Sequence, residues 1–270
     1  MDVVLNEKAK AKEIIESKQI YINLWKTKEL LVKYYYKESK DKEYTREKVI
    51  EFLKCIKTNV DGREYNIIKD MESIKKAVNI YTKDSFRLSD AKTILISKDE
   101  LERIKGLKNE PLEKLAFILL VVCKIQNTKT NKFTNWINNK TREFYKYSKN
   151  RGGVEYQELM LHRLYKSGLI GFAHVASPDS ISIQLNYIDR KVNKDDAEIE
   201  IGDFREVVLY YLQWKGVNIK QCEKCNKKIL NNTGSKKYCS PCSTVTDREN
   251  ARIRMQSKRK GEMFEVEATL

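Results

Sequence analysis

Four cysteines near the end of the chain have the residue type and the spacing of a metal-binding site. Cys222 and Cys225 form one Cys-x-x-Cys pair, Cys239 and Cys242 form a second, and thirteen residues separate the pairs. Two residues between the members of a pair let the backbone turn so that both thiolates face one ion, and zinc binds four such sulfurs in a tetrahedron. Four sulfurs leave no open position for water, so the spacing predicts one structural Zn²⁺ and not a catalytic one.

The segment between the two pairs has the pattern of a hairpin. Residues 227–230 and 235–238 are expected to form its arms, and Asn231-Asn232-Thr233-Gly234 supplies residues that tolerate the positive φ of a tight turn. This predicts a zinc ribbon with a short lead-in helix over residues 207–245. Two disulfides or four free thiols are the alternatives, but this spacing is typical of metal sites in cytosolic proteins.

The other two cysteines, Cys55 and Cys123, lie in apolar helical patterns. A free cysteine in such a pattern behaves as a small apolar residue. We therefore expect both side chains in the core.

Charge is distributed unevenly along the 270 residues, whose formal net charge is +15. Residues 215–260 hold thirteen basic side chains and three acidic ones, whereas residues 189–206 hold seven acidic and four basic ones. A concentrated positive segment indicates a polyanionic partner, and this segment lacks the broad apolar face that a membrane-binding helix needs. We therefore expect nucleic acid as the partner, with DNA favoured over RNA, and no membrane.

The residues expected to neutralise phosphates form two groups. The first group follows the hairpin turn and consists of Lys236, Lys237, Arg248, Arg252, Arg254, Lys258 and Arg259. The second group lies in the middle of the chain and consists of Lys132, Lys140, Arg142 and Lys146. Residues 246–249 have the pattern of a capping box, which predicts that a basic helix begins there, within a C-terminal segment of residues 246–270. A solvated terminal helix without a partner is the alternative.

The rest of the sequence predicts a mainly α fold. Apolar residues recur every three or four positions up to Thr82, which predicts an N-terminal helical unit over residues 1–92. A short strand at 93–96, a capping box at Ser97 and Glu100, and a helix opened by Pro111 begin a second domain, residues 93–206. Helical spacing continues over residues 133–147 and 156–164, and two apolar alternations then predict a β-hairpin.

Three helices followed by a hairpin are the element order of a winged helix-turn-helix. Residues 161–170 resemble the end of the recognition helix and the entry to the wing in bacterial regulators. The resemblance implies a winged-helix-like domain that reads DNA. Glu155 and Glu158 lie at the start of this helix, where they would repel phosphates, and many winged helices serve as protein-interaction modules.

The end of the chain carries a second resemblance. Tyr-Leu-x-Trp-Lys-Gly at residues 211–216 precedes the first cysteine pair, and Lys-Tyr-Cys-x-x-Cys closes the second. This arrangement resembles zinc-ribbon-tailed proteins of phages and mobile elements of Gram-positive bacteria. It implies a DNA- or RNA-related role such as transcription regulation. The alternative is a protein–protein interaction module, a phage-encoded inhibitor or adaptor that docks on a host complex.

The sequence predicts no enzyme. It has no phosphate-binding loop, zinc-protease motif or nucleophile elbow, and only two histidines. The acidic residues between Asp195 and Asp203 could bind Mg²⁺ for phosphodiester chemistry. However, the alternation Glu198-Ile199-Glu200-Ile201 predicts a strand whose acidic side chains face water.

The sequence also predicts a cytoplasmic protein. Its first residues lack a basic start followed by an apolar stretch. The longest uncharged apolar run, residues 116–123, is too short to cross a bilayer.

Overall fold

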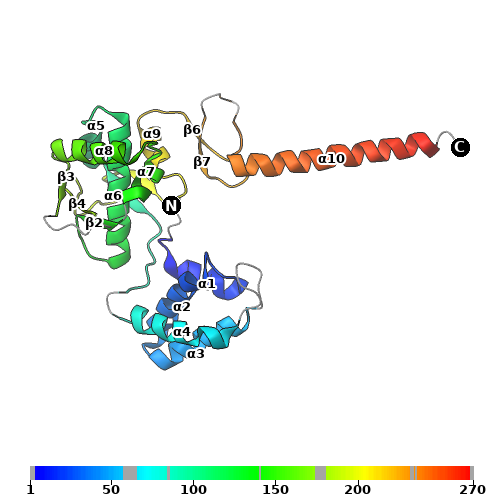
Figure 1. The fold of residues 1–270 in the computed structure, drawn as a ribbon, viewed down its shortest axis with the longest axis horizontal. Helices are drawn as coiled ribbons and strands as arrows, with labels where there is room; N and C mark the ends of the chain where they lie inside the picture. Colours follow the sequence, from blue (N-terminus) through cyan, green and yellow to red (C-terminus); the bar gives the residue numbers. More distant parts are fainter. Residues whose placement is uncertain are drawn as a thin grey trace. The chain divides into compact units, whose positions relative to one another are not determined.

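A computed structural model describes most of the chain (Figure 1). The described residues are 4–56, 66–83, 86–139, 141–173, 181–231, 234 and 236–267, and for residues 69, 139, 141, 142, 181 and 257–267 only the backbone is described. Residues 2–202 form one compact unit and residues 203–270 belong to another, and each is described by itself. Among the described residues, no helix combines the length and the apolar character needed to cross a bilayer.

The first part of the larger unit is helical, as predicted. Its helices are α1 (Glu7–Ser17), α2 (Leu24–Ser39), α3 (Lys42–Lys54) and α4 (Ile67–Tyr81). The side chains of Asn6, Asn23 and Asp41 accept hydrogen bonds from backbone N–H groups at the starts of α1, α2 and α3. Apolar residues from all four helices form one buried cluster, in which Leu31 and Leu53 are fully buried.

The second part of the larger unit surrounds one apolar helix. Its elements are β1 (Ile94–Ser97), α5 (Lys98–Lys105), α6 (Glu110–Thr130), β2 (Trp136–Asn139), α7 (Thr141–Ser148), α8 (Val154–Lys166), β3 (Ile170–Phe172), β4 (Ile181–Leu185) and β5 (Ala197–Ile201). Every residue from Leu115 to Val121 in α6 is buried, and α6 contacts α5, α7, α8, β1 and β2. Helix α6 is therefore the centre of this core, as its sequence predicts (Figure 1).

Local signals fix the helix ends in this part. The predicted capping box is present, since the Ser97 hydroxyl accepts from the Glu100 N–H while the Glu100 carboxylate accepts from the Ser97 N–H. Asn109 caps α6 and Pro111 lies in its first turn, where a missing N–H costs nothing. Gly168 follows α8 with φ of 76°, a left-handed conformation that glycine adopts without strain.

Two antiparallel sheets complete this part. Strand β1 pairs with β5 (Ile94 opposite Ile201), and β2, β4 and β3 form a second sheet in the order β2-β4-β3. In β5, Ile199 and Ile201 are buried while Glu198 and Glu200 are exposed, which confirms the predicted alternation.

The prediction of continuous helical spacing over residues 133–147 is wrong for its first half. Residues 136–139 form β2, with Ile137 fully buried and paired opposite Ile183 of β4. Positions 133, 136 and 137 fit one face of a helix, but they fit a short half-buried strand equally well. Residues 136–139 form a strand because their backbone groups pair with β4, and the local sequence pattern gives no sign of that partner.

Candidate metal centre

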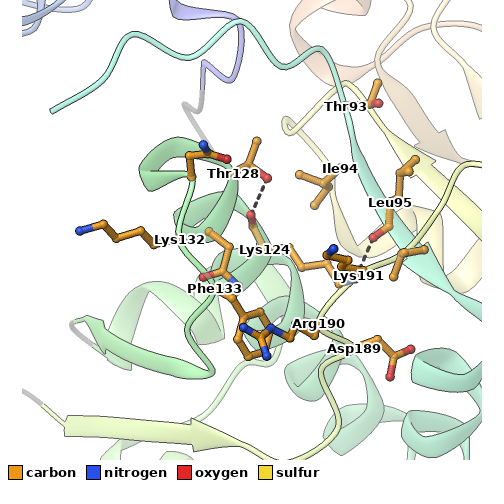
Figure 2. Close-up of a pocket in the computed structure, with 13 residues that line it drawn as sticks. Thr93, Ile94, Leu95, Lys124, Thr128, Lys132, Phe133, Asp189, Arg190 and Lys191 are labelled. Carbon is orange, nitrogen blue, oxygen red and sulfur yellow. Dashed lines mark hydrogen bonds between the residues drawn. The ribbon is translucent and has the colours of Figure 1, made fainter. Parts of the chain in front are cut away.

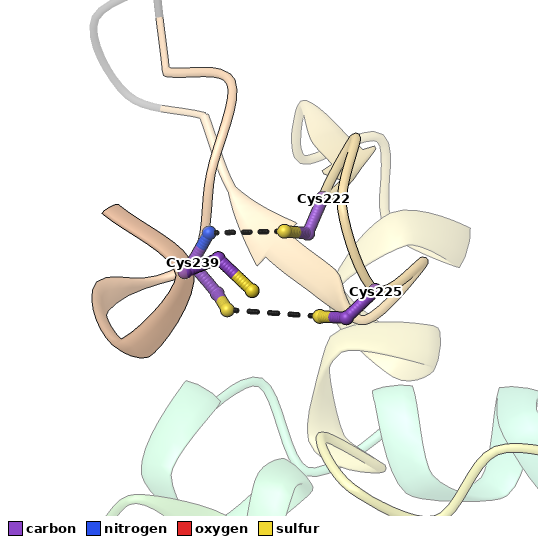
Figure 3. A group of neighbouring side chains, drawn as sticks. Cys222, Cys225 and Cys239 are labelled. Atoms are coloured by element: carbon purple, nitrogen blue, oxygen red, sulfur yellow. Dashed lines mark hydrogen bonds between the residues drawn. The ribbon is translucent and has the colours of Figure 1, made fainter. Parts of the chain in front are cut away.

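The structure brings the four predicted cysteines together in the unit that begins at residue 203. Their Sγ atoms all lie within 4.8 Å of one another, and those of Cys225 and Cys239 are 3.7 Å apart (Figure 3). All four cysteines are free, so the disulfide alternative does not describe this arrangement. The group is able to hold a metal ion, and it is the one His, Cys, Asp or Glu cluster of that kind among the described residues.

The first cysteine pair lies in the turn between two short strands. Strands β6 (Ile219–Gln221) and β7 (Lys228–Leu230) are antiparallel, with Lys220 opposite Ile229. The Cys222 N–H donates to the Lys227 carbonyl oxygen (2.8 Å), and the Asn226 N–H donates to the Cys222 carbonyl oxygen (2.8 Å). Asn226 has φ of 58°, which closes the turn and leaves both thiols on the same side of it.

This pairing corrects the predicted hairpin. The arm at 227–230 is a strand, but it pairs with β6, before the first cysteine pair, and residues 236–238 form no strand. Within the second predicted arm, the Lys237 carbonyl oxygen accepts one hydrogen bond from the Glu223 N–H (3.1 Å). Residues 232, 233 and 235 of the predicted turn and arm lie outside the described residues. The sequence did not indicate this pairing, because β6 lies beside β7 only once the turn that contains Cys222 and Cys225 has formed.

The second cysteine pair is at the start of a long helix, α10 (Ser240–Glu267). The Cys239 N–H donates to Cys222 Sγ (3.3 Å), which joins the two pairs directly. The predicted helix start at Thr246 is wrong, because α10 begins six residues earlier and the Thr246 hydroxyl donates to the Cys242 carbonyl oxygen inside the helix. Pro241 fits the first turn of a helix, a signal that the capping-box pattern at 246–249 obscured.

The thiols have unequal acidity. Burial acts to raise the pKa of Cys222, but the backbone N–H groups of Cys239, Cys225 and Lys224 outweigh it and lower this pKa to about 6. Hydrogen bonds with Cys239 and Cys225 raise the pKa of Cys242 to about 12. Four sulfurs this close cannot all carry negative charge unless a cation compensates them, so the full thiolate form of this group requires a metal ion.

Two charged side chains connect the first cysteine pair to neighbouring segments of the same unit. Arg205 donates from Nη2 to the Cys225 carbonyl oxygen (2.9 Å) and pairs with Asp203 (2.7 Å). Lys224, between the first two cysteines, pairs with Glu249 of α10 at 2.8 Å. Sequence reasoning missed Arg205 and Glu249 as supports, because no local motif relates either residue to the cysteines.

The first group of predicted phosphate contacts follows the cysteines. The side chains of Lys236, Lys237, Arg248, Arg252 and Arg254 are all exposed. Lys258 and Arg259 continue α10, but only their backbone is described. Within the described part of the chain, Arg248, Arg252 and Arg254 form no ion pair, while Glu249 beside them is held by Lys224.

The second group belongs to the larger unit. Lys132 and Lys146 are exposed, at the end of α6 and on α7. Arg142 lies in α7 with only its backbone described, and Lys140 lies outside the described residues. The two groups are in different units, so each is placed only within its own unit.

The acidic residues considered for Mg²⁺ chemistry form no metal-binding group among the described residues. The Glu200 carboxylate accepts a hydrogen bond from the Thr93 hydroxyl (2.8 Å), and Asp203 pairs with Arg205. Burial acts to raise the pKa of Asp203, but hydrogen bonds from Arg205 lower it overall. These contacts are those of a strand surface and a salt bridge.

Comparisons of this chain with protein-family models, with curated proteins and with solved structures find no match.

Proposed function

We propose that the four cysteines hold one structural zinc ion. Two sulfurs that each lie about 2.3 Å from a tetrahedral zinc ion are about 3.8 Å apart. The sulfurs of Cys225 and Cys239 are 3.7 Å apart, and all four sulfurs lie within 4.8 Å of one another, so an ion fits with a small inward shift. The backbone N–H that Cys239 donates to Cys222 Sγ is the kind of outer contact that stabilises a bound thiolate.

We further propose that the protein binds nucleic acid, with duplex DNA favoured, through the start of α10. The observation that carries this proposal is the group of exposed arginines Arg248, Arg252 and Arg254, which form no ion pair among the described residues, on a helix that begins inside the cysteine cluster. A helix with no core of its own is marginal in water, so attachment to a metal centre would hold these arginines in place. When these arginines contact DNA phosphates, counterions that were condensed on the DNA are released, and this release favours binding.

The larger unit offers a second candidate helix for contact with DNA. We propose a winged-helix-like arrangement for this part, since its element order is α6, β2, α7, α8, β3, β4 and its strand order is β2-β4-β3. In that arrangement α8 would be the recognition helix. The first turns of α8 expose Glu155 and Glu158, which repel phosphates. We therefore assign the main phosphate contacts to α10 and not to α8.

The test is the affinity of the full chain for a short duplex of random sequence, measured by fluorescence anisotropy. Replacing Arg248, Arg252 and Arg254 together by alanine should weaken binding by about tenfold or more, because three phosphate contacts are lost. The matched control replaces by alanine three exposed lysines of the N-terminal helices that form no ion pair with any described residue, Lys8, Lys12 and Lys42. Equal affinity of both variants and the unmodified chain would contradict the proposal.

A second candidate function is a protein–protein interaction module that docks on a host complex. Leu159, Tyr165 and Phe172 are 44%, 48% and 37% exposed, and the rings of Tyr165 and Phe172 stack with centroids 5.6 Å apart. An exposed apolar surface beside acidic residues favours a protein partner over a phosphate backbone. The acidic residues 189–206 would supply a second contact. Replacing Leu159 and Phe172 by serine would abolish capture of such a partner and leave DNA affinity unchanged.

A further inference from the structure

A pocket of about 490 Å³ lies between the end of α6, β1 and the segment that follows β4 (Figure 2). Its lining includes Lys132 and Phe133 just after α6, and Asp189, Arg190 and Lys191 from the later segment. This volume is within the range of small-molecule sites. All of its lining residues fall between positions 93 and 192 and so belong to the larger unit.

The pocket has an excess of positive charge. Lys132, Arg190 and Lys191 are exposed, and none of them forms an ion pair within the described residues. The one acidic side chain in the lining, Asp189, is already paired with Arg103 (3.1 Å) and accepts a hydrogen bond from the Ser97 hydroxyl. Three cations around this open pocket, with the single carboxylate occupied, favour an anionic ligand.

Polar contacts hold together the segments that line this pocket. The Lys124 ammonium donates to the Leu95 carbonyl oxygen (2.9 Å) and pairs with Glu100 (2.8 Å), so its charge is satisfied internally. The other oxygen of Glu100 accepts from the Asp189 N–H (2.8 Å). Since Asp189 precedes Arg190 and Lys191, this hydrogen bond fixes the backbone that carries two of the three pocket cations.

An aromatic side chain adds a second kind of recognition. Phe133 is 44% exposed, and the Arg190 guanidinium lies over its ring, 5.8 Å from the centroid (Figure 2). Among the described residues, Phe133 stacks on no other aromatic ring. A ligand ring could therefore stack against this pair while its anionic group meets the cations.

We propose that this pocket binds a nucleoside phosphate, with the base against Phe133 and Arg190 and the phosphate near Lys132 and Lys191. A single nucleotide suits this pocket better than a polymer does, because its lining holds three such cations, whereas a strand needs a continuous track of cations. The proposal does not depend on the DNA-binding function of α10. It reassigns Lys132 from contact with a nucleic-acid backbone to contact with a small ligand.

Isothermal titration calorimetry of the full chain with AMP, adenosine and ribose 5-phosphate tests this proposal. AMP should bind with one site per chain, and the other two compounds should bind at least about tenfold more weakly, since each lacks one recognised group. Arg190→Gln and Phe133→Leu should each weaken AMP binding by about tenfold. Arg163→Gln, an exposed change on α8 outside the pocket, should alter it less than about twofold.

Three results would overturn the proposal. The first is no measurable binding of AMP, and the second is an equal loss in the Arg190→Gln and Arg163→Gln variants. The third is a loss of duplex affinity in Arg190→Gln as large as its loss of AMP affinity, which would assign the pocket to a nucleic-acid strand. Unchanged duplex affinity together with lost AMP affinity supports the proposal whether or not α10 binds DNA.

Discussion

The Glu100 carboxylate lies 2.8 Å from the Lys124 ammonium, with 0% and 10% of the two side chains exposed. Glu100 also accepts hydrogen bonds from the backbone N–H groups of Ser97 and Asp189, and Lys124 donates to the Leu95 carbonyl oxygen. One ion pair therefore connects β1, α5, α6 and the segment after β4. It is the polar centre of the second part of the larger unit.

Removal of one partner should be strongly destabilising. Lys124→Met leaves a buried carboxylate without its cation, so we expect a loss of about 3–5 kcal/mol in the free energy of unfolding. The double variant Glu100→Gln and Lys124→Met should recover part of that loss. Urea unfolding of the three proteins provides the measurement, and a Lys124→Met variant as stable as the unmodified chain would rule out this role.

The N-terminal helices should be sensitive to acid through Glu29. Burial acts to raise the pKa of Glu29, but hydrogen bonds from Lys26 and Lys33 outweigh it and lower the pKa. A lowered carboxyl pKa adds stability that is complete above the unfolded value, about 4.3, and is lost as the pH falls through the folded value. The urea midpoint should fall over this range, and it should fall less in a Glu29→Gln variant. Identical pH profiles would contradict this assignment.

The cysteines should fall into three classes of reactivity. Cys55 is exposed, contrary to the sequence prediction, and should react with iodoacetamide in the native protein. Cys123 is buried, as predicted, and burial raises its pKa to about 12, so it should remain unmodified near neutral pH. The four clustered cysteines should react only after a chelator removes the metal. Peptide mass spectrometry before and after chelation distinguishes the three classes.

Arg205 should strengthen metal binding without being a ligand. Its hydrogen bond to the Cys225 carbonyl oxygen holds the first cysteine turn, so Arg205→Met should lower zinc affinity by about 10- to 100-fold. Competition with a coloured chelator measures this affinity. Lys215→Met, an exposed change in the same unit, is the matched control. A normal affinity in Arg205→Met would limit this arginine to its salt bridge with Asp203.

Local signals made much of the fold predictable from the sequence. Cysteine spacing identified all four members of the cluster, the capping box at Ser97 marked the start of α5, and Gly168 marked the end of α8. Each of these features depends on residues a few positions apart. The basic residues of α10 were also identified, although the helix begins earlier than the sequence indicated.

The features that were missed depend on residues far apart in the chain. Strand β2 needs β4 as a partner, and the pocket brings Phe133 beside Arg190. Neither contact can be predicted from the spacing of apolar residues along the sequence. Cys55 was misplaced because it follows an apolar helix pattern but stands just after α3 ends, where the side chain meets solvent.

The salt dependence of duplex binding tests the central claim most directly. If about six cations of the first basic group meet phosphates, the slope of log K against log salt should be near −5 for the full chain. Removing Arg248, Arg252 and Arg254 should make that slope shallower by about 2.7, since each contact contributes about 0.9. A flat salt response, or a slope that the three substitutions leave unchanged, would contradict DNA binding through α10.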